Sequence, residues 1–364
     1  MNEWVTREEK PPVESDLLLD EQPEDEAADF MPRYEHFRYV ADRKQSLLRI
    51  DKFLIDRMMN VSRNRIQLAA EAHCILVNGK PVKSNYRIKP LDVVSIVMSH
   101  PRYETEILPE DIPLDIVYED EDLLVVNKPA GLVVHPGHGN YTGTLVNALA
   151  WYLREDPQFD PADPAVGLVH RIDKDTSGLL VIAKRPETKT GLGLQFFHKT
   201  ARRQYTAMVW GILKDDGGRI EGNIGRDPHD RLQMAVFPDG EQGKPAVTHY
   251  RTRQRLGYVT LVECRLETGR THQIRVHMKH IGHPVFNDAR YGGDRILKGQ
   301  PFSKYRQFVQ RCFEVCPRQA LHAQTLGFVH PATGRELFFD SELPADMRLL
   351  IDNWNQYVLN NRES

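Results

Sequence analysis

The chain has 364 residues, of which 40% are hydrophobic and 27% charged, and its formal net charge is −3. The length predicts two or three domains, and the composition is ordinary for a soluble globular protein. No stretch approaches the roughly 20 apolar residues of a membrane-spanning helix, and the first residues lack the basic start and apolar run of a signal peptide. Four scattered cysteines favour reduced thiols and a cytoplasmic location over a disulfide framework.

The small net charge hides two unlike segments. Residues 1–46 carry 13 acidic and six basic side chains, and residues 1–30 show no hydrophobic periodicity, so an acidic, disordered tail is expected over 1–46. Residues 43–89, in contrast, carry 11 Lys and Arg against three Asp and Glu. This basic block indicates a polyanionic partner, although a solvated helix face explains the charge count equally well.

A small domain is predicted over residues 47–103. Leu48, Ile50, Phe53 and Leu54 recur at near-helical spacing, and Asn78-Gly79 is a strong signal for a tight turn between strands. In chain order we expect a helix from about residue 47 to 55, a second helix over 63–73 with Ser62 as its cap, a strand over 75–77 before the turn, and a last strand over 92–97.

A linker near residues 101–113 leads into a longer region rich in short strands. Interspersed helices predict an α+β domain around a large mixed, mainly antiparallel sheet. The stretch 291–318 is expected to be an irregular insertion or a helical arm. Strands are expected over 116–118, 123–127, 179–183, 205–210, 259–266 and 336–339, and helices over 145–152, 187–199 and 271–282.

Four segments of this larger region hold more charged, aromatic and glycine residues than a core needs. The first, NKPAGLVVHPG from Asn127, is a strand that runs into a loop. The second, GLVHRIDKDTSGLLVIAK from Gly167, places seven polar residues between two apolar runs, which indicates a loop at a sheet edge. Its Asp173 and Asp175 suggest the carboxylate pair of a hydrolase, but Asp before Thr-Ser-Gly is more often a turn residue.

The third segment, RRQYTAMVWG, reads as a strand that carries Tyr205, which would either stack on an RNA base or pack in the core. The fourth, LETGRTHQIRVHMKHIGHP, contains four histidines at spacings of five, three and three. These spacings do not fit zinc, and the neighbouring arginines would repel a cation, so no metal site is expected. Arg270 and Arg275 instead indicate recognition of a phosphate or a carboxylate.

Taken together, the segments resemble the motifs of the RluA-type pseudouridine synthases. HRIDKDTSG is similar to the family signature HRLDxxTSG, with Ile172 in place of the usual Leu. NKPAGLVVHPG, RQYTAMVWG and LETGRTHQIRVH resemble the other family motifs, in the same order, and GKPAVTHYR and QALHAQTLGFVHP are also similar to family segments. Four ordered motifs are far more specific than any one of them. The resemblance covers about residues 107–350 and implies a catalytic domain with the pseudouridine synthase fold over 107–364.

This resemblance implies an isomerase that converts uridine to pseudouridine in RNA without a cofactor. Asp173 matches the nucleophile, and Arg275 matches the arginine that keeps it ionised. Tyr205 matches the motif tyrosine, expected to stack on uracil and to assist loss of the C5 proton. Arg171 is expected to help extrude the base, which costs a few kcal/mol. Phosphate contacts are expected from Lys128 and Arg270.

The small domain resembles the alpha-L RNA-binding domain, and the combination resembles the RluD/RluC branch, which modifies large-subunit ribosomal RNA. It implies a cytoplasmic monomer that acts on this RNA or on a pre-ribosomal particle, with no membrane partner. RNA contacts are expected from Arg63, Arg65, Lys80 and Lys83. Three alternatives stay open: a synthase acting on tRNA, an inactive ribosome-assembly factor, and a glycosidase, for which no second well-spaced carboxylate is evident.

Overall fold

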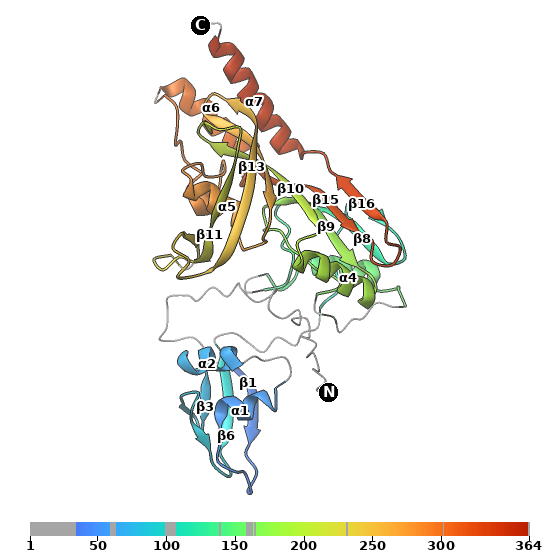
Figure 1. Cartoon of the computed structure of the whole chain (residues 1–364), viewed down its shortest axis with the longest axis vertical. Helices are drawn as coiled ribbons and strands as arrows, with labels where there is room; N and C mark the ends of the chain where they lie inside the picture. Colours follow the sequence, from blue (N-terminus) through green and yellow to red (C-terminus); the bar gives the residue numbers. More distant parts are fainter. Residues whose placement is uncertain are drawn as a thin grey trace, which may run out of the picture. The chain divides into compact units, whose positions relative to one another are not determined.

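The computed structural model describes the chain from residue 34 to residue 362, except for residues 59–62, 99–106, 138–139, 158–162, 164, 231 and 301 (Figure 1). The described residues fall into two compact units, and the second begins at Ile107. Each unit has a hydrophobic core of its own. No helix in the described ranges is long and apolar enough to cross a membrane.

The smaller unit is a four-stranded sheet in the order β1-β6-β3-β4, with two helices and a two-stranded ladder of β2 and β5. Ile50, Phe53 and Leu54 are fully buried in its core, which explains their near-helical spacing in the sequence. Its elements are β1 (Tyr34–Val40), β2 (Leu48–Arg49), α1 (Ile50–Ile55), α2 (Arg63–Glu71), β3 (Ile75–Val77), β4 (Lys80–Pro81), β5 (Arg87–Ile88) and β6 (Val93–Met98).

Two expectations for this unit are wrong in part. Residues 34–40, expected in a disordered tail, form strand β1, which pairs antiparallel with β6. The first helix begins at Ile50 because residues 48–49 pair with β5 instead. The expected cap Ser62 and the tail over 1–33 lie outside the described residues.

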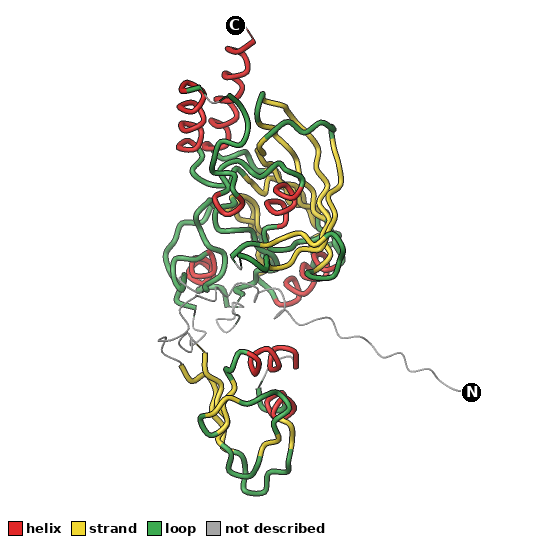
Figure 2. Tube along the Cα trace, turned by 90° about the vertical axis from the view of Figure 1, so that its left-hand side faces the viewer, coloured by secondary structure: helices red, strands yellow, loops and turns green. Residues whose placement is uncertain are grey.

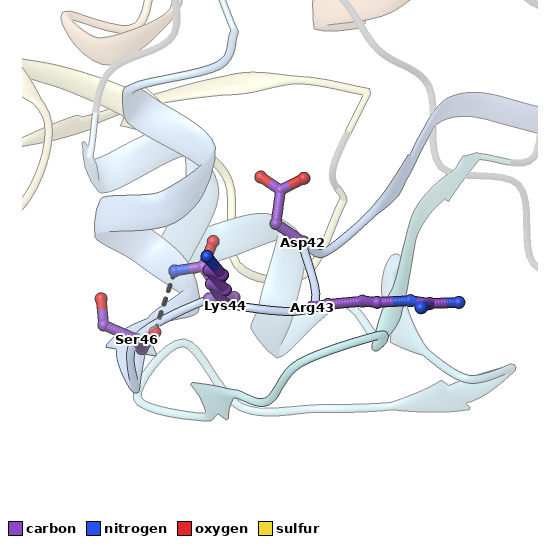
Figure 3. Close-up of a pocket in the computed structure, with 5 residues that line it drawn as sticks. Asp42, Arg43, Lys44 and Ser46 are labelled. Carbon is purple, nitrogen blue, oxygen red and sulfur yellow. Dashed lines mark hydrogen bonds between the residues drawn. The ribbon is translucent and has the colours of Figure 1, made fainter.

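The expected tight turn is present at Asn78-Gly79, where both residues have positive φ, 49° and 78°. This conformation suits Asn-Gly, the pair that favours two-residue hairpins. Another turn, formed by residues 42–46, lines a shallow hollow on the surface of the unit (Figure 3). The side chains of Asp42 and Arg43 point in different directions there, and Gln45 donates to the Ser46 carbonyl at 2.9 Å.

The larger unit confirms the expected α+β class. It is built on a ten-stranded sheet in the order β12-β11-β13-β14-β10-β15-β9-β8-β7, with β16 also paired to β15. Of the described pairs in this sheet, only β15 with β9 is parallel. Its strands are β7 (Ile116–Glu119), β8 (Leu123–Lys128), β9 (Ser177–Ala183), β10 (Arg202–Trp210), β11 (Gly217–Arg226), β12 (Met234–Phe237), β13 (Lys244–Leu256), β14 (Val259–Leu266), β15 (Leu321–Val329) and β16 (Glu336–Asp340).

Helices cover different parts of the sheet, whose strands are strongly curved in the second view (Figure 2). Helix α4 packs on β9 and β15, and α5 packs on β11, β12 and β13. All seven residues of β9 are buried because apolar clusters lie on both of its faces. The helices are α3 (Leu145–Leu153), α4 (Pro186–Phe197), α5 (Gln273–His280), the 3-10 helix η2 (Ala289–Tyr291), α6 (Ser303–Val315) and α7 (Ala345–Arg362).

The stretch 291–318 is packed against the body of the unit. It contains α6, whose Tyr305, Val309 and Cys312 are buried in an apolar cluster with Trp210 and Trp354. Helix α7 completes this cluster and contacts both α6 and β13 (Figure 1). The stretch is therefore helical over 303–315 and irregular in the described residues between η2 and α6, so each of the two expectations holds for a part of it, and it forms part of a second core.

Candidate active site

Asp173 lies in the short loop that leads into β9. Ile172 before it is 6% exposed and anchors the loop in the main core, while a backbone bond of 3.0 Å from Thr176 to the Asp173 carbonyl closes a turn. The Asp173 side chain keeps 18% of its surface exposed. The strand entry therefore fixes the carboxylate in place while leaving it open to a substrate.

Arg275 of α5 holds this carboxylate. Its Nη1 donates to Asp173 Oδ2 at 2.9 Å, so the expected pairing of the two side chains is present. Its Nε and Nη2 donate to the two oxygens of Asp288 at 2.7 and 2.9 Å. Asp288 is fully buried and also accepts from the backbone N–H of Tyr291 as the cap of η2. This bidentate pair fixes the guanidinium plane and leaves Nη1 directed at Asp173.

The charges around Asp173 keep it ionised. Burial alone would raise the pKa of Asp173, but the positive charges of His272, Arg275 and Arg171, with the hydrogen bond from Arg275, lower it to about 2. The carboxyl group is therefore an anion at any pH at which the protein works. A partly exposed, charged and rigidly held carboxylate is suited to nucleophilic attack.

His272, weighed in the sequence only as a metal ligand, stands beside this pair. It precedes α5 with φ 53°, in the left-handed region that a residue with a side chain rarely adopts. Its Nδ1 shares a hydrogen bond of 2.7 Å with the hydroxyl of Tyr291, whose ring lies 5.1 Å below the Arg275 guanidinium. Such local backbone strain is typical of functional sites.

Tyr205 lies on β10 and is 6% exposed. Burial raises the pKa of its phenol, and the Asp173 charge raises it further against the opposing effect of Arg203. The phenol therefore stays neutral near neutral pH. A neutral ring beside the carboxylate favours stacking on a base over proton removal as a phenolate.

Two buried basic side chains hold the Asp173 loop through its carbonyls. Lys128, 1% exposed, donates from Nζ to the carbonyls of Pro129, Leu132 and Lys174 at 2.7–2.8 Å. Arg318, 8% exposed, donates from Nη1 to the Asp175 carbonyl at 3.0 Å. The carbonyls of Lys174 and Asp175, which follow Asp173 in the chain, are thus bound by Lys128 and Arg318 respectively.

The other residues expected to contact the substrate, Lys128, Arg171 and Arg270, differ in their contacts and in their relation to Asp173. Three carbonyls accept hydrogen bonds from Lys128 Nζ, so this side chain holds the loop in place. No phosphate contact is assigned to Lys128. Arg171 lies within electrostatic range of Asp173. Arg270 precedes α5 and donates from Nε to the Pro245 carbonyl at 3.1 Å. The sequence alone did not reveal Asp288 or Arg318. Asp288 has the pattern of an ordinary helix cap, and Arg318 lies outside the four site segments.

In the smaller unit, Lys80 and Lys83 are exposed, whereas Arg63 is tied to the fold. The Arg63 guanidinium donates to the buried carboxylate of Asp51 at 3.2 Å, and Arg49 binds the same carboxylate at 2.8 Å. Arg63 still keeps 53% of its side chain exposed. The side chain of Arg65 lies outside the described residues.

One group among the described residues has the spacing of metal ligands, formed by Asp120, Asp122 and His330. His330 Nδ1 accepts from the backbone N–H groups of Ala332 and Thr333, so its Nε2 carries the proton and donates to Asp120 at 3.0 Å. A protonated Nε2 cannot bind a metal. This group is therefore a hydrogen-bonded brace, and the four histidines of 272–283 are not part of it.

A reachable, ionised carboxylate with a buried guanidinium at its side is the arrangement of an enzyme active site. Residues 122–280 match the RNA pseudouridylate synthase family, and residues 48–94 match the S4 domain. An uncharacterized RNA pseudouridine synthase of Chlorobaculum parvum is 47% identical over 310 residues, 85% of this chain and 94% of that protein. The ribosomal large subunit pseudouridine synthase D of Zymomonas mobilis is 43% identical over 309 residues, 83% of this chain and 92% of that protein.

Among solved structures, human RNA pseudouridylate synthase domain containing 4 shares the fold, with a TM-score of 0.50 and 24% identity over 66% of this chain and 92% of that one. The chain belongs to the RNA pseudouridine synthase family and is an isomerase.

Proposed function

We propose that this enzyme converts uridines of large-subunit ribosomal RNA to pseudouridine, with Asp173 as the nucleophile. The observation that carries the proposal is the 2.9 Å contact from Arg275 to a carboxylate that remains partly exposed and ionised. The relative from Zymomonas mobilis is named for the large ribosomal subunit, and an S4 domain accompanies the catalytic unit. Both favour ribosomal RNA over tRNA.

The reaction balances without an external reagent. The bond between N1 of uracil and C1′ of ribose breaks, the base turns, and C5 forms a new bond to C1′. The proton that C5 loses is matched by the one that N1 gains. Asp173 would attack C1′ of the sugar or C6 of the base, and its low pKa serves either route.

The neighbouring side chains have separate roles in this proposal. Tyr205, neutral and buried, stacks on the extruded uracil and can pass on the C5 proton through its hydroxyl. Arg171 fills the space that the base leaves, and Arg270 contacts a nearby phosphate. The exposed Lys80 and Lys83 of the smaller unit bind the RNA backbone. The proposed enzyme works as a monomer in the cytoplasm, where ribosomal particles are assembled.

Asp173→Asn tests the nucleophile. The amide keeps the shape of the side chain but loses the charge, so pseudouridine formation in large-subunit ribosomal RNA transcripts should fall below detection. Binding of the same transcripts, measured by filter retention, should change by less than about threefold because the other contacts remain. Mass spectrometry of digested RNA measures the product.

Asp215→Asn changes an exposed carboxylate outside the four site segments; it is the matched control and should react at the wild-type rate. Product formation by Asp173→Asn would refute the nucleophile. A wild-type enzyme that modifies only tRNA would refute the substrate. A wild-type enzyme that binds ribosomal RNA and modifies no uridine would identify an assembly factor instead.

A further inference from the structure

A cavity adjoins the Asp173–Arg275 pair, and we propose that it binds a nucleotide next to the target uridine and prefers a base with an exocyclic amino group. The inference rests on the proposed function, because it assumes that the site acts on a uridine within RNA. It adds to that function a preference for sequence context.

The cavity measures about 500 Å3, which is within the range of ligand-binding sites. Arg275 and Asp288 form one wall of it, and Asp173 is not among its lining residues. The other walls come from the Asp173 loop, the loop between β11 and β12, η2, and the segment before β15. A base bound here would therefore lie across the Arg275 guanidinium from the uridine at Asp173.

Two of the three arginines that line the cavity are already paired. Arg275 binds Asp173 and Asp288, and Arg318 binds Asp346 and backbone carbonyls. Arg290 is exposed, donates from Nη1 to the Leu232 carbonyl and, within the described ranges, has no carboxylate partner. The interior thus offers no unpaired cation for a phosphate, while Arg290 at the surface suits the phosphate that links two nucleotides.

Acceptor atoms dominate the rest of the lining. Gln319, 5% exposed, donates Nε2 to Thr176 at 3.4 Å, and its Oε1 receives no hydrogen bond from the part of the chain that the structure describes. Asp175 likewise has no hydrogen bond or ion pair to its carboxylate among the described residues. No donor among the described residues thus occupies the Gln319 oxygen or the Asp175 carboxylate, so both can accept a hydrogen bond from a base bound in the cavity.

The loop between β11 and β12 adds a third acceptor group with a fixed orientation. Asp230 Oδ2 accepts from Gln233 Nε2 at 2.8 Å, and Oδ1 accepts from the Leu232 backbone at 3.0 Å. Gln233 is held in turn by Lys279, which donates to its Oε1 at 2.8 Å. Each Asp230 oxygen keeps a lone pair for another donor.

Adenine, cytosine and guanine each carry an amino group that can donate to such acceptors. Uracil has carbonyl oxygens on both sides of its single N–H, and carboxylates would repel them. Asp175, Asp230 and the Gln319 oxygen therefore select an amino-bearing base beside the target uridine.

The test compares synthetic RNA hairpins that contain a uridine shown to be modified by the wild-type enzyme. The base on its 5′ or 3′ side is adenine in one hairpin and purine, which lacks only the amino group, in the other. Loss of the amino group on one side should lower kcat/KM about tenfold, the effect of one hydrogen bond to a charged group. In Asp230→Asn and Asp175→Asn this difference should shrink to less than about threefold.

Asp239→Asn is the matched control, because Asp239 is exposed, follows β12 and does not line the cavity; it should keep the wild-type discrimination. Equal kcat/KM for adenine and purine hairpins on both sides would refute the subsite while leaving the synthase activity proved. No product from any hairpin or rRNA transcript would refute the proposed function itself. Discrimination that survives both variants would show that other residues read the base.

Discussion

Arg275 links two carboxylates of opposite roles. Asp288 is fully buried and fixes the guanidinium, whereas Asp173 is partly exposed and accepts from Nη1. One buried arginine between two carboxylates leaves a net negative charge, which His272 and Arg171 offset from their nearby positions. The charge state of Asp173 therefore depends on its neighbours more than on its own exposure.

Arg275→Gln should make catalysis depend on pH. Without the guanidinium, burial raises the pKa of Asp173, so its ionised fraction falls as the pH drops through the raised value. The single-turnover rate at pH 7 should fall roughly 100-fold, and it should fall further toward pH 5. Between pH 7 and pH 5 the wild-type rate should show no decrease from protonation of Asp173, because the pKa of Asp173, about 2, lies far below this range.

Arg295→Gln, an exposed arginine outside the cavity and the site, serves as the control and should reproduce the wild-type profile. If Arg275→Gln folds and its pH profile runs parallel to that of the wild type, Arg275 does not set the ionisation of Asp173. Thermal unfolding followed by circular dichroism checks that the variant is folded.

At this scale the sequence predicted that Asp173 and Arg275 lie together, and it missed the residues that hold this pair. Asp173, Arg275 and Tyr205 stand in recognisable motifs, and the structure brings Asp173 and Arg275 together. Asp288 lies in a stretch that looks like a turn, because it caps η2 as well as binding Arg275. Only the fold reveals that one side chain does both.

At the scale of elements, the C-terminal helix reaches the Asp173 loop through Arg318. Asp346 in the first turn of α7 accepts from Arg318 Nε at 2.7 Å and from Nη2 at 3.1 Å. In the same guanidinium, Nη1 donates to the carbonyls of Asp175 and Leu321, and Nη2 also donates to Ser177 Oγ. Helix α7, β15 and the loop before β9 are thus held by a single buried side chain.

Arg318→Met should slow the chemical step more than it weakens RNA binding. The Asp175 carbonyl loses its donor, so the loop can move, and a displacement of about 1 Å at a reacting group can cost roughly 100-fold in rate. The single-turnover rate at saturating enzyme should fall by that order, with the KM for RNA changed less than about threefold. The measurement is made well below the melting temperature of the variant.

Arg348→Met removes an exposed ion pair with Glu342 near the start of the same helix and should leave both constants unchanged. A purely structural role for Arg318 would lower the melting temperature while the rate per folded molecule stayed at the wild-type value. That result would remove Arg318 from the residues that position Asp173.

The sequence predicted several strands well and missed others for a physical reason. β8 and β9 are almost entirely buried, so their sequences are apolar runs that are easy to recognise. Both strands were expected within a few residues of their observed bounds. β11 and β13 were missed because many of their residues are exposed, so polar side chains interrupt the apolar alternation. β1 was missed because it follows the acidic segment and forms an edge of its sheet.

At the scale of the whole molecule, charge is separated along the chain. Residues 1–46 are acidic, and the basic block that follows lies in the unit that matches the S4 domain. Several of its cations, among them Lys80, Lys83, Arg87 and Lys89, are exposed, whereas Arg49 and Arg63 share the buried carboxylate of Asp51. The exposed lysines are therefore better placed for phosphate contacts than the two arginines.

The double variant Lys80→Glu with Lys83→Glu should weaken binding of ribosomal RNA and reduce its dependence on salt. Each lost phosphate contact releases about one counterion fewer, so the slope of log K against log salt should become shallower by about 2. The reaction rate at saturating enzyme should stay within about twofold, since the chemistry lies in the other unit. Lys298→Glu with Lys304→Glu makes the same change of net charge on exposed residues of the larger unit and should leave the slope unchanged. Equal slopes for both double variants would mean that the smaller unit does not bind the RNA backbone through these lysines, and that the basic block is a solvated surface.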